Sequence, residues 1–298
     1  MSDYNGKIAV ITGGGGGIGH GIALACLKEG IKVVLADINE ERLAQNAEKL
    51  TSETGGEIST FRMDATCEED FLKLKAFVLE KYGKVNFLFN NAGVSFHKDF
   101  LLLTDTDWEF ILRSNLWSVI YGMRTFMPVM EENDDVAYII NTASGAAIRF
   151  LDSMSHYSTT KSAVVLLTGA VQREEQLRGG KIQFMAVMPS FVTANLIDSI
   201  KDLRVGKWKP DLEEQTASDI EQEKIYYNAV TAPYLHPELF PKAAKRYLSI
   251  TNEDAGKIIL QHIHEGKNFC FTHEGWDDAA VHYGNVLKRG YIKVPHND

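Results

Sequence analysis

Short apolar runs alternate with longer amphipathic segments along this 298-residue chain. The runs predict β-strands at Ile8–Thr12, Lys32–Ala36, Glu57–Met63, Phe87–Asn90, Ala137–Asn141, Ile182–Val187 and Phe269–Phe271. Between them, apolar residues recur at helical spacing near residues 18–29, 40–52, 68–82, 105–131, 156–177 and 253–265. Short strands that are almost wholly apolar are typical of a parallel sheet with helices on both faces. The pattern therefore predicts an α/β fold, a doubly wound parallel sheet of about seven strands, in a single domain over residues 1–298.

Residues 194–250 interrupt this alternation. Five of the seven prolines lie between Pro189 and residue 250, together with aromatic side chains such as Trp208 and Tyr234 and several charged groups. An insertion of this length in a compact domain is typical of a lid or a small subdomain. The segment follows the carboxyl end of a strand, where ligands bind in open α/β sheets, and this position favours a substrate lid. A surface excursion that packs against a neighbouring subunit is the alternative.

Composition and charge narrow the class of protein. Apolar residues make up 45% of the chain and charged residues 24%, as in globular proteins with a substantial core. The net charge of −9 and the lack of a basic run argue against binding to nucleic acid. No apolar run is long enough for a bilayer and no signal-peptide pattern precedes the first strand, so we expect no membrane association. Three widely spaced cysteines predict no disulfide framework, and a cytoplasmic location is the expectation that follows.

A glycine-rich turn joins the first expected strand to the first expected helix. It reads Thr12-Gly13-Gly14-Gly15-Gly16-Gly17-Ile18-Gly19. A pyrophosphate requires free backbone N–H groups and the positive end of a helix, with no side chains in its way. Gly13, Gly17, Ile18 and Gly19 are therefore predicted to bind a dinucleotide cofactor. A flexible linker is the alternative, but a linker would not join two buried elements so tightly.

The second expected strand leads into Asp37, eighteen residues beyond Gly19. A carboxylate at this position can accept hydrogen bonds from the adenosine ribose hydroxyls, and it would repel a 2′-phosphate. Ile38 follows it, and the glycine loop contains no arginine or lysine that could hold such a phosphate. NAD is therefore favoured over NADP. The alternative role of Asp37 is a cap for the next helix, beside Asn39.

A tyrosine and a lysine four residues apart, Tyr157 and Lys161, share one face of an expected helix, and Ser144 precedes the tyrosine by thirteen residues. About one such tyrosine–lysine pair is expected by chance in a chain of this composition, so the pair alone carries no weight. The glycine loop, Ser144 and the tyrosine–lysine pair follow one another in this order, and that order indicates a hydride-transfer enzyme with a nicotinamide cofactor.

In this order the motifs resemble those of the short-chain dehydrogenase/reductase family, over about residues 6–195. The resemblance implies a Rossmann-type fold and a catalytic tetrad of Asn115, Ser144, Tyr157 and Lys161. It assigns further residues to the cofactor site, which with those above are Gly13, Gly17, Ile18, Gly19, Asp37, Ile38, Asp64, Ala65, Asn91, Ala92, Gly93, Tyr157, Lys161, Pro189 and Val192. Ser190 departs from the family pattern, because a glycine usually follows the proline there. Residues 105–131 and 156–177 match helices that pair between subunits in relatives, so a homodimer or homotetramer is expected.

The resemblance also implies a mechanism, an NAD-dependent interconversion of a secondary alcohol and a ketone. Tyr157 would move the hydroxyl proton, although a free tyrosine has a pKa of about 10. Lys161, together with the positive charge of the oxidised nicotinamide, would lower that pKa. Ser144 would orient the substrate oxygen, and Asn115 would hold a water that links Lys161 to solvent.

The substrate and the alternatives depend on weaker signals. The aromatic residues of 194–250, with Phe96 and Phe150, favour a bulky apolar or aromatic substrate. We expect His156 and the other histidines to be structural or on the surface, and no histidine or cysteine spacing indicates a metal. The competing hypothesis is a catalytically silent NAD-binding protein with a regulatory or redox-sensing role. Such a protein would be expected to lack Tyr157 or Lys161.

Overall fold

The computed structural model describes residues 4–149, 151–190, 192, 250–273 and 280–281. Within them, seven parallel strands form one sheet in the order β3-β2-β1-β4-β5-β6-β7. The strands are β1 (Ile8–Thr12), β2 (Lys32–Asp37), β3 (Ile58–Arg62), β4 (Phe87–Asn90), β5 (Tyr138–Thr142), β6 (Gln183–Met188) and β7 (Phe269–Phe271). Their positions confirm the predicted doubly wound sheet, with shifts of a residue or two at some ends.

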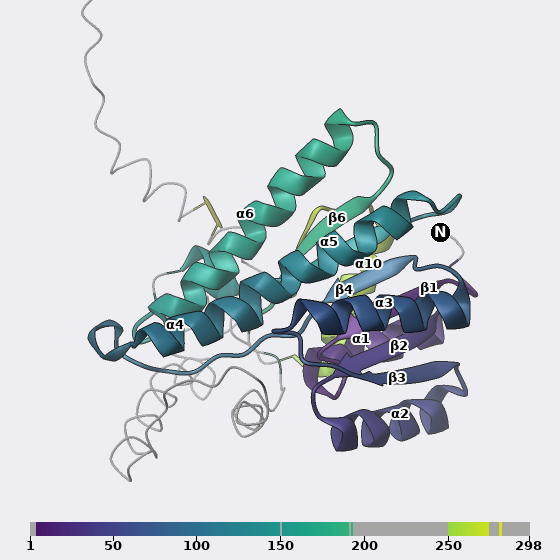
Figure 1. Cartoon of the computed structure of the whole chain (residues 1–298), viewed down its shortest axis with the longest axis horizontal. Helices are drawn as coiled ribbons and strands as arrows, with labels where there is room; N and C mark the ends of the chain where they lie inside the picture. Colours follow the sequence, from purple (N-terminus) through teal and green to yellow (C-terminus); the bar gives the residue numbers. More distant parts are fainter. Residues whose placement is uncertain (1–3, 150, 191, 193–249, 274–279, 282–298) are drawn as a thin grey trace, which may run out of the picture.

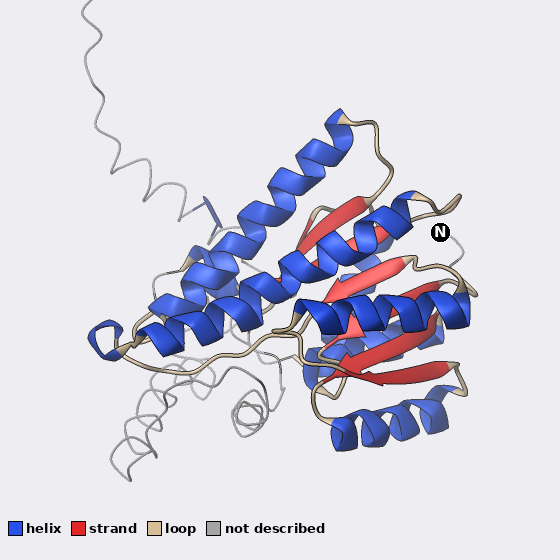
Figure 2. Ribbon diagram, in the orientation of Figure 1, coloured by secondary structure: helices blue, strands red, loops and turns tan. Residues whose placement is uncertain are grey.

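Helices cover the sheet on both sides (Figures 1 and 2). They are α1 (Gly17–Lys28), α2 (Glu40–Thr54), α3 (Glu68–Tyr82), α4 (Asp105–Leu112), α5 (Ser118–Glu131), α6 (Ser155–Leu177) and α10 (Asn252–His264). Short turns of helix are η1 (Phe100–Leu102), η2 (Arg113–Trp117) and η3 (Gly145–Ile148). Apolar side chains of α1 and α10 fill the core on one face, and those of α3, α5 and α6 fill it on the other.

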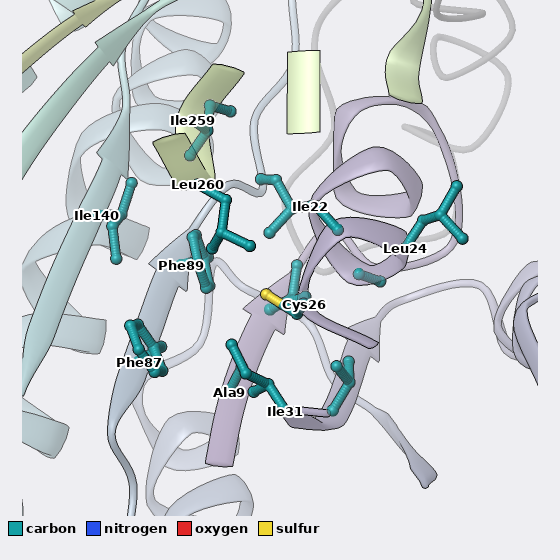
Figure 3. Packing of buried hydrophobic residues seen from close by; sticks show 14 of the residues in the cluster. Ala9, Ile22, Leu24, Cys26, Ile31, Phe87, Phe89, Ile140, Ile259 and Leu260 are labelled. Carbon is teal, nitrogen blue, oxygen red and sulfur yellow. The ribbon is translucent and has the colours of Figure 1, made fainter. Parts of the chain in front are cut away.

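The core beneath α1 shows why these strands carry apolar residues at nearly every position. Ile22 and Cys26 of α1 meet Leu260 of α10 above β1 and β4, as Figure 3 shows. All five residues of β1 and all four of β4 are buried. A strand that is covered on both faces has no position at which a polar side chain would reach water.

The segment expected as one helix over residues 105–131 is three elements. α4 ends at Leu112, the π-helical turn η2 follows, and α5 begins at Ser118. The predicted helical segment is confirmed, since Leu112, Arg113, Trp117 and Ser118 all keep right-handed helical backbone angles across the junctions. The π turn within it was not predicted. Thr104 caps α4, since Thr104 and Asp107 exchange the reciprocal hydrogen bonds of a capping box.

The strand order reverses between β1 and β4, because β2 and β3 lie on one side of β1 and β4 to β7 on the other. In open α/β sheets this is where a crevice forms at the carboxyl ends of the strands. The glycine-rich turn follows β1 at this end, and the segment with Asn91 follows β4. The proposed lid, residues 194–250, lies outside the described residues except for Ile250, and so does Phe150.

Candidate active site

The glycine loop between β1 and α1 has a backbone that demands glycine at three of the predicted positions. Gly13 and Gly17 have φ angles of 67° and 54°, in the left-handed region. A Cβ on Gly19 would lie 2.2 Å from the carbonyl oxygen of Gly13. The loop therefore turns tightly enough to bring the first residues of α1 back beside β1.

The N-terminus of α1 lacks the side chains that cap or neutralise a helix end. Its N-cap is Gly16, which makes no side-chain capping hydrogen bond, and its first turn contains no acidic residue. α2 differs, because Asn39 caps it and Glu40 and Glu41 lie in its first turn. An uncapped helix end with free N–H groups favours an anion, so the residues present fit the pyrophosphate of a dinucleotide.

Asp37, at the end of β2, lies beside this loop. Its Oδ2 accepts a hydrogen bond from Gly15 N at 3.0 Å and its Oδ1 accepts one from Asn39 N at 3.0 Å. Burial raises the pKa of the Asp37 carboxyl, and these backbone hydrogen bonds act in the opposite direction. Asn39 caps α2 by accepting from Arg42 N. Asp37 therefore does not cap α2, and its carboxylate joins β2 to the glycine loop.

The segment after β4 is fastened to the end of β1. Thr12 Oγ1 accepts hydrogen bonds from Asn91 N and Ala92 N, both at 3.0 Å. Asn91 Nδ2 in turn donates to Thr12 O at 3.1 Å. Thr12 was not among the predicted site residues, although its place before the glycines was the available signal. It keeps Asn91, Ala92 and Gly93 next to the loop.

The other predicted cofactor residues lie on the carboxyl side of the sheet. Asp64 follows β3 and accepts two hydrogen bonds from Thr66, at 2.9 and 2.6 Å. Ala65 packs partly buried against the core. Pro189 follows β6 and accepts from Gly145 N at 2.8 Å, and Val192 pairs with Ile250 in an isolated bridge.

Tyr157 and Lys161 lie one turn apart on α6, as their spacing predicts. Lys161 is 3% exposed, and its Nζ donates to Thr142 O, at the end of β5, at 2.8 Å. Nζ lies 5.8 Å from the centre of the Tyr157 ring. Burial lowers the pKa of Lys161 to about 8. The carbonyl of Thr142 is a partner that no side-chain motif could reveal.

Ser144 follows β5 and caps η3, where its side chain accepts from Ala146 N at 3.1 Å. Burial raises the pKa of Tyr157, and a hydrogen bond with Ser144 opposes that shift. The predicted lowering of the pKa of Tyr157 involves two positive charges, that of Lys161 and that of the bound oxidised nicotinamide, and it stays a prediction.

Asn115 is buried in the π turn η2. Its Oδ1 accepts from Val94 N at 2.8 Å, and its Nδ2 donates to Val94 O at 3.0 Å and to Thr160 Oγ1 at 3.2 Å. Thr160 precedes Lys161 on α6. The Asn115 side chain therefore ties the loop after β4 to the catalytic helix.

His156 is fully buried and, as predicted, takes a structural place beside Tyr157. Its ring lies 4.3 Å from that of Phe96 and 6.4 Å from that of Trp108, centre to centre. Phe96 is itself only 2% exposed, so it contributes to the core under the site. Among the described residues, no group of three histidine, cysteine, aspartate or glutamate side chains could hold a metal ion. No helix in that part of the chain has the length and apolarity needed to cross a membrane.

A seven-stranded parallel sheet with a glycine loop after its first strand defines the Rossmann-type class of α/β proteins. A family model described as short chain dehydrogenase matches residues 7–204. The chain therefore belongs to the short-chain dehydrogenase/reductase family of oxidoreductases, and the resemblance noted in the sequence is confirmed.

Three relatives illustrate the range of this similarity. The chain is 31% identical over 196 residues to a "CLA biosynthesis dehydrogenase/reductase" of Lactiplantibacillus plantarum, covering 66% of this chain and 68% of the relative. It is 29% identical over 208 residues to a cyclohexanol dehydrogenase of an Acinetobacter strain, covering 70% and 81%. A short chain dehydrogenase/reductase from Burkholderia phymatum, solved in complex with NAD, superposes with a TM-score of 0.85 at 27% identity, covering all of both chains.

Proposed function

We propose that this protein is an NAD-dependent oxidoreductase that interconverts a secondary alcohol and a ketone. The observation that carries the proposal is the meeting of Ser144, Tyr157 and Lys161 at the carboxyl end of the sheet, beside an open helix N-terminus. The first two are joined by a hydrogen bond, and the buried Lys161 lies under the tyrosine ring. NAD supplies the hydride acceptor or donor when it is bound.

Each side chain has a separate task in alcohol oxidation. Ser144 orients the hydroxyl oxygen of the substrate, because its own hydroxyl retains a proton to donate after accepting from Ala146 N. Tyr157 takes the hydroxyl proton while the carbon-bound hydrogen leaves as hydride. Lys161 stabilises the resulting tyrosinate with a charge that little water screens. Asn115 positions α6, and we infer that it also holds the water of a proton relay.

The choice of NAD over NADP rests on Asp37. Its half-buried carboxylate lies next to Gly15 of the loop, where a 2′-phosphate on the adenosine ribose would meet a negative charge. The NAD complex of the Burkholderia relative supports the same choice.

The substrate class rests on the surroundings of Tyr157. Val94, Leu103 and Trp108 pack, partly buried, against the same apolar cluster as the tyrosine. An apolar wall beside the catalytic group favours a bulky apolar or aromatic alcohol. The cyclohexanol dehydrogenase relative is consistent with a secondary alcohol.

The test is hydride transfer by the wild type and by Tyr157→Phe, over a panel of aliphatic, cyclic and aryl secondary alcohols with NAD⁺ and with NADP⁺. We expect turnover with NAD⁺ in the wild type, a loss of at least about 100-fold in Tyr157→Phe, and nearly unchanged NADH binding. Tyr82→Phe is the matched control, since Tyr82 lies on α3 and bonds Ser59. A wild type that binds NADH without any turnover would favour the silent, regulatory alternative instead. Equal rates with both cofactors would contradict the role of Asp37.

We further propose that the protein is a homodimer or homotetramer that associates through α5 and α6. Leu166 on α6 is 74% exposed and Trp117, just before α5, is 39% exposed. Apolar side chains of this size on two neighbouring helices are typical of a surface that another subunit covers.

A further inference from the structure

A buried histidine and a buried asparagine lie behind the glycine loop, on the side of α2. His20 is in the first turn of α1 and is 6% exposed, and Asn46 is on α2 and is 7% exposed. His20 Nδ1 lies 2.5 Å from Asn46 Oδ1. Asn46 Nδ2 donates to Gly14 O at 2.7 Å. Neither side chain belongs to the proposed catalytic tetrad, and the glycine-loop motif specifies the residue type at neither position.

The chemistry of these groups gives the chain of hydrogen bonds a direction. A carbonyl oxygen can only accept, so Gly14 O requires the NH₂ group of Asn46. The amide oxygen of Asn46 then faces His20, and Nδ1 of His20 must carry a proton to bond it. The pair therefore holds Asn46 in one orientation, with its donor on the loop.

The remaining polar groups of this part of the loop are held by β2. Gly14 N donates to Ala36 O at 3.0 Å, and Gly15 N donates to Asp37 Oδ2 at 3.0 Å. A Cβ on Gly14 would lie 2.9 Å from Leu35 Cβ, so the loop lies flat on β2. The carbonyl of Gly14, by contrast, is fixed by a side chain from another helix, that of Asn46 on α2.

We propose that His20 and Asn46 are positioning residues for the cofactor, an inference that rests on the proposed function. They draw the Gly14 carbonyl toward α2 and away from the bound pyrophosphate, whose negative charge it would repel. The loop then presents its N–H groups at the N-terminus of α1 without a carbonyl dipole among them. Losing the donor of Asn46 frees that carbonyl to turn.

The sharpest variant is Asn46→Asp, which keeps the size of the side chain and the acceptor for His20 but removes the donor to Gly14. We expect NADH to bind about 10-fold or more weakly, since a lost buried hydrogen bond is joined by repulsion from the freed carbonyl. His20→Leu should weaken binding less, and His20→Gln, which restores a donor, should recover affinity. In steady state, KM for NAD⁺ should rise while kcat changes little.

The matched control is Gln45→Glu, the same amide-to-carboxylate change one residue earlier, on the exposed side of α2. It should bind NADH as the wild type does. Titration with ADP, which carries the pyrophosphate, should show the loss in Asn46→Asp, and titration with adenosine should not. Asn46→Ala provides a second variant without the donor if Asn46→Asp does not fold.

A merely structural role for the pair predicts a lower melting temperature with unchanged NADH affinity in Asn46→Asp, Asn46→Ala and His20→Leu. That result would overturn the inference, as would an equal loss of affinity in Gln45→Glu. A wild type that does not bind NADH would overturn the proposed function itself, and this inference with it. Weak binding confined to the Asn46 variants and His20→Leu supports both.

Discussion

The α-carbon of Gly93 lies between the side chains of Asn115 and Lys161, two members of the proposed catalytic tetrad. A Cβ on it would be 3.1 Å from Asn115 Oδ1 and 3.1 Å from Lys161 Nζ. Both atoms already have partners, Val94 N for the first and Thr142 O for the second. A methyl group at this position would therefore require the side chain of Asn115 or Lys161 to shift by a few tenths of an ångström.

Gly93→Ala should displace Lys161 by a few tenths of an ångström and reduce kcat/KM by up to about 10-fold, because misplacement of a group that moves protons costs rate steeply. The fold should persist, since the neighbouring atoms belong to side chains that can move. Steady-state kinetics measures the loss, and circular dichroism with a thermal melt is the control. Wild-type kinetics in Gly93→Ala would mean that Lys161 tolerates displacement.

His156 makes stability depend on pH. Burial lowers its pKa from 6.5 to about 4, the Phe96 backbone and Asp107 oppose this shift, and the charges of His97 and Lys98 add to it. The unfolded chain binds a proton at this histidine below pH 6.5, whereas the folded protein binds one only below about 4. The folded state therefore loses stability as the pH falls from 6.5 toward 4.

His156→Leu should make stability depend less on pH over this range. Urea unfolding at pH 7.5 and at pH 5 compares the two proteins, and the free energy of unfolding of the wild type should fall more between these pH values. An equal fall in both proteins would show that other groups account for the acid sensitivity.

At the scale of elements, α1 and α10 cross closely enough to exclude a methyl group. A Cβ on Gly256 would lie 2.0 Å from Gly21 O, and one on Gly21 would lie 1.7 Å from Asn252 O. These contacts are with backbone atoms, which cannot turn aside as a flexible side chain does. The crossing holds α10 against the same helix whose N-terminus forms the cofactor site.

Gly256→Ala should lower the free energy of unfolding by about 1–3 kcal/mol or more, as overpacking in a core does. Stability should fall even though alanine has a higher helix propensity than glycine. Lys257→Ala, the next residue and 61% exposed, is the control and should change stability by less than about 0.5 kcal/mol. A stabilised Gly256→Ala would show that the helices can separate without cost.

At the scale of the whole molecule, association through α5 and α6 is open to a direct test. Light scattering should give a dimer or tetramer for the wild type. Leu166→Glu places a charge on the proposed interface and should shift the protein toward smaller species. Leu101→Glu is the matched control, because Leu101 is 92% exposed and lies in η1, outside these helices. A monomeric wild type would contradict the proposed oligomer.

The sequence by itself determined the elements of the sheet, and it supplied the residues of the proposed site. A strand that is buried on both faces is apolar throughout, and a helix that is buried on one face has apolar residues at helical spacing. Both patterns can be recognised from residues that are close together in the sequence. The demand for glycine at Gly13 and Gly17 is equally local, because a positive φ constrains a single residue. These features could be predicted before any contact was known.

Only the tertiary structure decided how those residues meet. The hydrogen bonds of Asn115 to Val94 and Thr160, the Thr142 carbonyl on Lys161 and the Asn46 donor on Gly14 all join elements that are distant along the chain. Such contacts depend on the path of the backbone, and a carbonyl partner has no residue type that could signal it. The pKa of Tyr157 depends in the same way on burial by the assembled fold, so the direction of its shift could not be predicted from the tyrosine–lysine spacing.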